Sequence, residues 1–80
     1  MYTVYIIYSD TFDSFYIGYS ANVQTRLKQH NDGLTKSTKA KIPWRLVYTE
    51  IFQTKSEAIK RERFLKDQKN KSFYKRLANL

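Results

Sequence analysis

The chain of 80 residues has no cysteine, one histidine, one proline and two glycines. Without cysteine it can form neither a disulfide framework nor a cysteine-ligated zinc site, and one histidine cannot supply a histidine-rich metal site. No apolar run approaches the roughly 20 residues that span a membrane, and the first residues lack the basic start of a signal peptide.

The short length of the chain limits the size of its core, because such a chain buries only roughly 60% of its unfolded surface. A multidomain enzyme or a large dinucleotide-binding fold is therefore not expected. We expect a single domain over residues 1–80, cytoplasmic and monomeric, in which aromatic residues at 16% of the composition stabilise a small core.

Acidic residues are scarce beside basic ones: fifteen Lys and Arg face seven Asp and Glu, a formal net charge of +8. Residues 1–25 contain two acidic residues and no basic one, so every Lys and Arg lies in residues 26–80. A positive field of this size attracts polyanions, and nucleic acid gains further because neutralised phosphates release counterions. Nucleic acid is therefore the leading partner, ahead of an anionic membrane surface or a basic surface that only confers solubility.

Two strands are predicted near the start of the chain. Residues 2–8 (YTVYIIY) are rich in β-branched and aromatic types, and both alternating sets of side chains are largely apolar, so this strand should be covered on both faces. Residues 15–19 form the second strand, and the Ser and Asp residues between the two suit a hairpin turn. Gly18 within that strand indicates a bulge or the close approach of another backbone, including that of a ligand.

Helices and a third strand are predicted in the remainder. A helix over 22–31 has Asn22 as its N-cap and ends at Asp32 and Gly33, and a basic loop (34–43) leads to a strand over 44–52. A capping box from Thr54 to Glu57 starts a helix that runs to about residue 69. A last short helix would be capped by Ser72, with Phe73, Leu77 and Leu80 on one face. The order β-β-α-β-α-α predicts an α+β fold with a three-stranded, mainly antiparallel sheet flanked by helices.

One carboxylate lies on the apolar face of a predicted helix, where a surface residue is not expected. Glu62 falls within the apolar stripe that Ala58, Ile59 and Leu65 define on the helix after Thr54. An inward carboxylate must be paired, hydrogen-bonded, protonated or bound to a metal. The simplest interpretation is an ion pair with Arg26 or Lys60, and a metal-binding role is the alternative.

Arg26 and His30 form a second candidate group, because their i, i+4 spacing places both on one helix face. Arginine offers a planar fork of donors that suits phosphate, and histidine titrates near neutrality. Beside the apolar residues Val23 and Leu27, however, a lone histidine is more often a buried residue whose hydrogen bonds are satisfied.

Tyrosine is the third signal, since five of the seven tyrosines fall in the first two predicted strands. Each could simply pack in the core or at an edge, with its hydroxyl at the surface. Pairing of the two strands would nevertheless bring Tyr5 and Tyr16 close together. A phenol becomes a useful base at neutral pH only where nearby cations lower its pKa, and cations are abundant in this chain.

Taken together, these residues resemble the GIY-YIG nuclease superfamily. The paired motif that names it is matched by Thr3-Val4-Tyr5 and, after a gap of ten residues, by Tyr16-Ile17-Gly18. Arg26 and His30 follow at R-x-x-x-H spacing, then a basic loop ending in Pro43-Trp44, then a helix with Glu62. The resemblance spans essentially the whole chain and is closest to small stand-alone bacterial members, which are related to the nuclease domain of excision-repair endonucleases.

The resemblance implies hydrolysis of a DNA phosphodiester with one divalent metal, magnesium or manganese, held by Glu62. Arg26 would stabilise charge on the phosphoryl oxygens, and Tyr16 would deprotonate the attacking water with Tyr5 hydrogen-bonded beside it. His30 would serve as an auxiliary acid or base or as a phosphate contact. No small-molecule cofactor and no membrane is implied.

The sequence departs from the family pattern in two places. Thr3 and Val4 replace the Gly and Ile of the first triplet, and Tyr19 stands where some members carry a lysine that contacts phosphate. We therefore expect the backbone contacts with DNA to come from the loop and the start of the third strand, at Lys36, Lys39, Lys41 and Arg45.

A rival interpretation is a basic nucleic-acid-binding module with negligible or lost catalytic activity. In that case Tyr5, Tyr16 and Glu62 would be remnants in the core. A purely structural or protein-interaction role is the third possibility, and the salt dependence of DNA binding would separate it from the other two.

Overall fold

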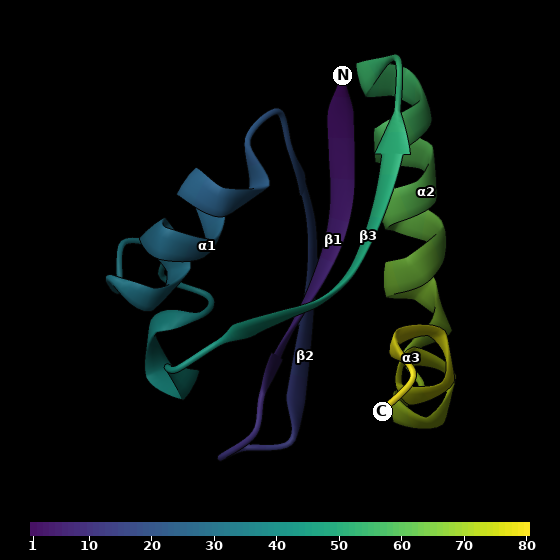
Figure 1. Ribbon diagram of the computed structural model, residues 1–80. Helices are drawn as coiled ribbons and strands as arrows, with labels where there is room; N and C mark the ends of the chain where they lie inside the picture. The colour runs from purple at the N-terminus through teal and green to yellow at the C-terminus, as the bar shows by residue number, and fades with distance from the viewer.

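The computed structural model describes residues 1–80 as a three-stranded antiparallel sheet with three α-helices (Figure 1). The elements are β1 (Tyr2–Ser9), β2 (Ser14–Ser20), α1 (Val23–Asn31), the 3-10 turn η1 (Lys39–Lys41), β3 (Arg45–Phe52), α2 (Lys55–Gln68) and α3 (Lys71–Ala78). The predicted order and the α+β class are confirmed, and the loop predicted over 34–43 contains the turn η1. No helix combines the length and the apolar character needed to cross a membrane.

The first strand occupies the centre of the sheet, whose order is β2-β1-β3. Val4 and Ile6 point to one face, and Tyr5 and Ile7 point to the other, and all four are at most 1% exposed. The prediction that this strand is covered on both faces is therefore confirmed. Both β2 and β3 are therefore edge strands.

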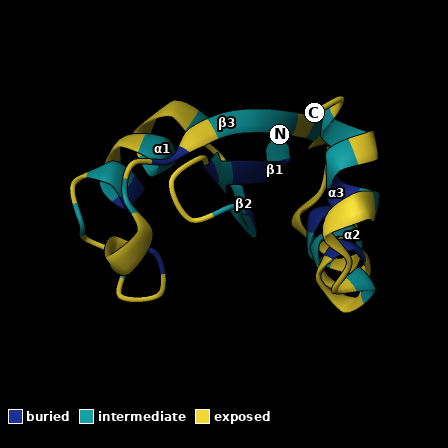
Figure 2. Ribbon diagram, turned by 90° about the horizontal axis from the view of Figure 1, so that it is seen from below, coloured by how far each residue is buried: buried dark blue, intermediate teal, exposed yellow.

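Helices cover the two faces of the sheet from opposite sides, as the view along the sheet shows (Figure 2). On one face α1 and the following loop pack over Tyr5, Ile7 and Trp44. On the other face α2 and α3 enclose a larger apolar cluster: Val4, Ile6, Ile17, Ala58, Leu65 and Tyr74. The edge strand β2 thus runs between two helical layers.

Side-chain caps define where the first two helices begin. The side chain of Asn22 accepts a hydrogen bond from the backbone N–H of Thr25 at 3.1 Å. Both halves of the capping box between Thr54 and Glu57 are formed. These two predicted helix starts are confirmed, and each cap satisfies an N–H that the helix cannot bond internally.

The predicted start of the last helix is wrong by two residues. Asn70, not Ser72, is the N-cap of α3, and its side chain accepts from the N–H of Phe73 at 3.2 Å. The reason is that Lys69 adopts a left-handed conformation with φ of 48°, so the chain reverses at once and α3 begins immediately. The buried residue of α3 is Tyr74, whereas Leu80 lies beyond the helix and is 48% exposed.

Polar contacts hold α3 against the rest of the molecule. The hydroxyl of Tyr74 donates to the carbonyl of Leu65 at 2.7 Å and accepts from the N–H of Lys69 at 3.1 Å. Lys71 and Lys75 each lie 3.4 Å from the carboxylate of Asp13 in the β1–β2 turn. The end of α2, α3 and the hairpin turn are thereby joined.

Candidate active site

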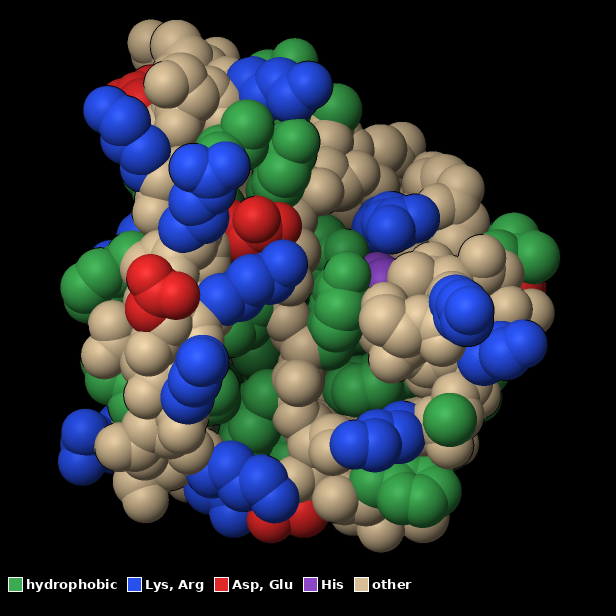
Figure 3. Space-filling model, turned by 180° about the vertical axis from the view of Figure 1, so that it is seen from behind, with side chains coloured by type: hydrophobic (Ala, Val, Ile, Leu, Met, Phe, Trp, Pro, Cys, Tyr) green, Lys and Arg blue, Asp and Glu red, His purple; other side chains and the backbone are tan.

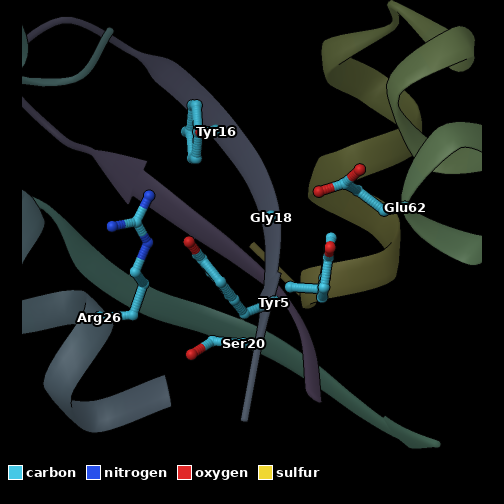
Figure 4. A pocket seen from close by; sticks show the side chains of 7 residues that line it. Tyr5, Tyr16, Gly18, Ser20, Arg26 and Glu62 are labelled. Atoms are coloured by element: carbon cyan, nitrogen blue, oxygen red, sulfur yellow. The ribbon is translucent and has the colours of Figure 1, made fainter. Parts of the chain in front are cut away.

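A pocket of about 340 Å³ opens along the edge strand β2 (Figure 4). Its lining residues are Tyr5, Tyr16, Gly18, Tyr19, Ser20, Arg26 and Glu62. Four of the five predicted catalytic residues, Tyr5, Tyr16, Arg26 and Glu62, are therefore brought together. The fifth, His30, does not line the pocket.

The position of β2 explains why residues so far apart in sequence converge. Helix α1 lies over one face of the sheet and supplies Arg26, while α2 lies over the other face and supplies Glu62. Only at the edge strand, where the sheet ends, can side chains from the two layers reach the same space. Figure 4 shows the guanidinium and the carboxylate on opposite sides of this space, with Tyr5 and Tyr16 between them.

Gly18 makes room for one of the tyrosines. It pairs with Tyr5 across the strands, and a Cβ placed on Gly18 would lie 2.6 Å from the Tyr5 hydroxyl oxygen. Any larger residue would displace the ring. The predicted bulge or close approach of another backbone at Gly18 is not what the structure shows: the pairing is regular, and the group that needs the space is the Tyr5 ring.

The Tyr5 hydroxyl is held by neighbours at the rear of the pocket. It lies 2.8 Å from Nε2 of His30, and the Arg26 side chain lines the same pocket. Burial raises the pKa of Tyr5 to about 12, although the neighbouring Arg26 opposes the shift. Tyr5 is therefore a neutral phenol at physiological pH.

His30 is buried behind the two tyrosines. It is fully buried, its Nδ1 lies 2.8 Å from the Thr38 hydroxyl, and its ring meets that of Tyr16 edge-on at 5.0 Å between centroids. Burial and, to a smaller extent, the charge of Arg26 lower the pKa of His30. The placement matches a buried histidine with both ring nitrogens bonded, and a direct phosphate contact would require those bonds to break.

Glu62 is mostly buried and has a partner on its own helix. Its side chain is 16% exposed, and its carboxylate lies 3.7 Å from Nζ of Lys66, one turn further along α2. Arg26 in turn donates to the side chain of Gln29 at 3.0 Å. The predicted ion pair of Glu62 with Arg26 or Lys60 is therefore not formed: Glu62 pairs with Lys66 and Arg26 bonds to Gln29, each within its own helix.

Three residues at or near the pocket were not predicted from the sequence: Lys66, Ser20 and Thr38. The i, i+4 spacing of Glu62 and Lys66 is a signal that could have identified the pair. Lys66 also lies over the Tyr16 ring, with Nζ 5.9 Å from the centroid, so it borders the pocket. Thr38 lies in a loop without periodicity, and no sequence pattern marks it as a neighbour of His30.

The four predicted DNA contacts lie in the loop after α1 and at the start of β3. Lys36 and Lys39 are exposed, and Lys41 donates to the hydroxyl of Ser14 at 3.0 Å. Arg45 forms an exposed ion pair with Asp10 at 2.8 Å. Figure 3 shows Lys and Arg side chains on both ridges that flank the hollow between α1 and α2, so positive charge surrounds the pocket from two sides.

The fold and the spacing of these residues are those of a known class of catalytic domain. A sequence model of the GIY-YIG catalytic domain matches residues 1–77, and the chain therefore belongs to the GIY-YIG family.

Particular relatives are small bacterial proteins. A UPF0213 protein of Bacillus licheniformis is 47% identical over 64 residues, which are 76% of this chain and 66% of that protein. A UPF0213 protein of Staphylococcus saprophyticus is 50% identical over 50 residues, 61% of each chain. The chain thus spans slightly less than two thirds of the length of these relatives. The solution NMR structure of a UPF0213 protein from Bacillus halodurans, 38% identical, superposes with a TM-score of 0.50 over 84% of this chain and 72% of that chain.

Proposed function

We propose that this chain hydrolyses phosphodiester bonds of DNA with the help of one divalent cation, magnesium or manganese. The observation that carries the proposal is the convergence of Arg26 and Glu62 on one pocket with two tyrosines between them. The pocket combines a donor for phosphate, an oxygen ligand for a hard cation and a phenol oxygen that can take a proton. Cleavage of this kind would serve DNA repair or processing, as in the excision-repair endonucleases that the sequence resembles.

The donor set fits a magnesium-like cation. No three His, Asp or Glu side chains gather anywhere in the structure, so a cation here would have Glu62 as its protein ligand. Magnesium is commonly held by one or two carboxylates, with water and substrate phosphate completing its shell. The partner of Glu62, Lys66, is half-exposed and 3.7 Å away, so it can move into solvent while the cation replaces it as the positive partner of the mostly buried carboxylate. A bound cation would polarise the phosphate and stabilise the leaving oxygen.

The residues of the chain divide the remaining tasks. Arg26 would bind the phosphoryl oxygens and stabilise the charge that develops on them. In its phenolate form, with its own proton already lost to solvent, Tyr16 would take the proton of the attacking water, because its hydroxyl is not the one that His30 holds and Tyr5 keeps its own proton up to a pKa of about 12. His30 would support Tyr5 from the core and would not touch the substrate.

The arrangement of charge supports DNA as the substrate. The ridges on either side of the hollow carry basic residues from α2 on one side and from α1 with its loop on the other (Figure 3). We propose that Lys36, Lys39, Lys41 and Arg45 contribute contacts with the DNA backbone. Arg45 would do so at the expense of its exposed pair with Asp10, which costs little because such pairs are weak.

One observation favours a binding module that does not cut. Glu62 and Arg26 each have a protein partner, Lys66 and Gln29, so the pocket is satisfied without a cation or a phosphate. In such a module the basic ridges would bind DNA and no bond would break.

A plasmid-nicking assay decides between the two functions. With magnesium or manganese, we expect supercoiled plasmid to be converted to nicked circles, and with a chelator we expect no conversion. If the plasmid stays supercoiled with either metal while DNA binding persists, the binding module is the correct function.

A further inference from the structure

A buried series of hydrogen bonds connects the loop after α1 to the pocket. The Thr38 hydroxyl lies 3.3 Å from the carbonyl of Thr35 and 2.8 Å from Nδ1 of His30, and Nε2 of His30 lies 2.8 Å from the Tyr5 hydroxyl. Thr38 and His30 are fully buried, and Tyr5 is 1% exposed. Thr38 itself is fixed, since its backbone carbonyl accepts from the indole N–H of Trp44 at 2.9 Å.

The numbers of donors and acceptors in this series of hydrogen bonds favour one tautomer of His30. If Thr38 donates to Thr35, then Nδ1–H of His30 donates to Thr38, and Nε2 accepts from the Tyr5 hydroxyl. Every donor of the series then has an acceptor, and the remaining lone pair of the Tyr5 oxygen is free toward the pocket.

The opposite tautomer leaves a proton without a partner. If Thr38 donates to Nδ1, its bond to the Thr35 carbonyl is lost, and Nε2–H donates to the Tyr5 oxygen. The proton of Tyr5 then has no acceptor in the protein and must point into the pocket. The first arrangement keeps every bond of the series within the protein, including that of Thr38 to the Thr35 carbonyl, and is therefore favoured.

We propose that Thr38 is a positioning residue: through His30 it fixes the direction of the Tyr5 hydroxyl, so that Tyr5 presents an acceptor oxygen to the pocket. The assignment of the His30 tautomer does not depend on whether the protein cleaves DNA. The consequence for catalysis rests on the proposed function, in which the Tyr5 oxygen accepts a hydrogen bond from the attacking water and orients it toward Tyr16.

The tautomer can be read directly in the wild-type protein. His30 is the only histidine of the chain, so a long-range ¹H–¹⁵N correlation spectrum contains a single imidazole. We expect the neutral form protonated at Nδ1. A neutral ring protonated at Nε2 would overturn the proposal without any variant being made.

Thr38→Val tests the catalytic consequence, since valine keeps the shape of threonine and removes its acceptor. We expect the ring to switch to Nε2–H and the single-turnover cleavage rate to fall about 10- to 100-fold, as for the loss of other groups that orient an active-site histidine. Thr38→Ser, which keeps a hydroxyl, should restore both the Nδ1–H form and the rate. Thr35→Val, which removes a neighbouring hydroxyl that does not contact His30, should behave as wild type.

The outcomes separate the two levels of the proposal. A Thr38→Val protein with a switched tautomer and the wild-type rate would overturn the catalytic role of Thr38. Loss of rate in both Thr38→Val and Thr38→Ser, with Nδ1–H kept in both, would show that Thr38 acts only on the fold. If the wild-type protein does not cut DNA, the proposed function fails, and the spectrum still decides whether Thr38 sets the tautomer.

Discussion

At the scale of single residues, the two tyrosines of the pocket differ in how they are held. The Tyr5 hydroxyl bonds to buried His30, whereas Tyr16 is only half-buried and meets His30 through its ring. The two tyrosine side chains therefore have different environments within one pocket. The two phenols should respond differently to the same chemical change.

We expect Tyr16→Phe to slow cleavage by roughly 100-fold or more, because it removes the proposed general base. Its stability should change by no more than about 1 kcal/mol, the usual value of one hydrogen bond. The matched change Tyr5→Phe should slow cleavage less and destabilise more, by about 1–3 kcal/mol, since Nε2 of His30 loses its donor. Single-turnover rates and urea denaturation of both variants check this, and a Tyr16→Phe protein that cuts at the wild-type rate would remove Tyr16 from the chemistry.

The lowered pKa of His30 predicts a pH dependence of stability. Folded His30 holds its proton less tightly than the unfolded chain, whose value is near 6.5, so the unfolded state binds more protons as the pH falls. The free energy of unfolding should therefore fall as the pH drops below about 6.5 and should not change on account of His30 above it. Urea denaturation at pH 7.5 and 5.5 measures the loss. His30→Gln, which cannot titrate, should lose less over this range, and an equal loss in both proteins would contradict the buried neutral histidine.

At the scale of secondary-structure elements, the corner between α2 and α3 depends on one hydroxyl. Tyr74 is 7% exposed, and its hydroxyl joins the carbonyl of Leu65 to the N–H of Lys69, which adopts the left-handed conformation. We expect Tyr74→Phe to lower the free energy of unfolding by about 1–3 kcal/mol, because it leaves backbone groups of α2 without a partner. Tyr2→Phe changes the same atom on a half-buried strand residue and should cost less. Equal losses in the two variants, measured by thermal or urea unfolding, would show that the corner does not depend on this bond.

The elements with local signals could be predicted from the sequence. Asn22 and the Thr54–Glu57 box mark helix starts because their hydrogen bonds involve neighbours three residues away, which sequence spacing shows directly. The start of α3 could not be fixed so easily, because Asn70 and Ser72 are both good caps. The left-handed turn at Lys69 decides between them, and the packing of Tyr74 on α2 holds that turn.

In the site, too, some residues could be predicted from the sequence, whereas their partners could not. The two strands and their register place Tyr5 and Tyr16 together, and the family motif points to Arg26 and Glu62. The partners of these residues depend on tertiary packing: His30 is placed by the cluster around Trp44, and Thr38 reaches it from an irregular loop. Sequence periodicity contains no information about that loop.

At the scale of the whole molecule, the charge of the chain should appear in its binding to DNA. We expect log affinity for duplex DNA to fall steeply with log salt, by about 0.9 for each phosphate neutralised. Replacing Lys36, Lys39 and Lys41 by Ala should flatten this slope by about 2 to 3 units if each contacts one phosphate. Fluorescence anisotropy over a range of salt concentrations measures the slope. An unchanged slope would place the DNA elsewhere, along Lys66, Lys69, Lys71 and Lys75.

The central claim is that the pocket on β2 cuts DNA with a cation held by Glu62. The most direct test is the single-turnover cleavage rate of Glu62→Gln with saturating magnesium, beside Asp67→Asn, which makes the same change at an exposed position of α2. Glutamine keeps the shape of the side chain but not the charge that binds the cation. We predict that Glu62→Gln folds normally and loses cleavage by at least about 100-fold, while Asp67→Asn cuts as wild type. A Glu62→Gln protein that cuts at the wild-type rate would contradict the account.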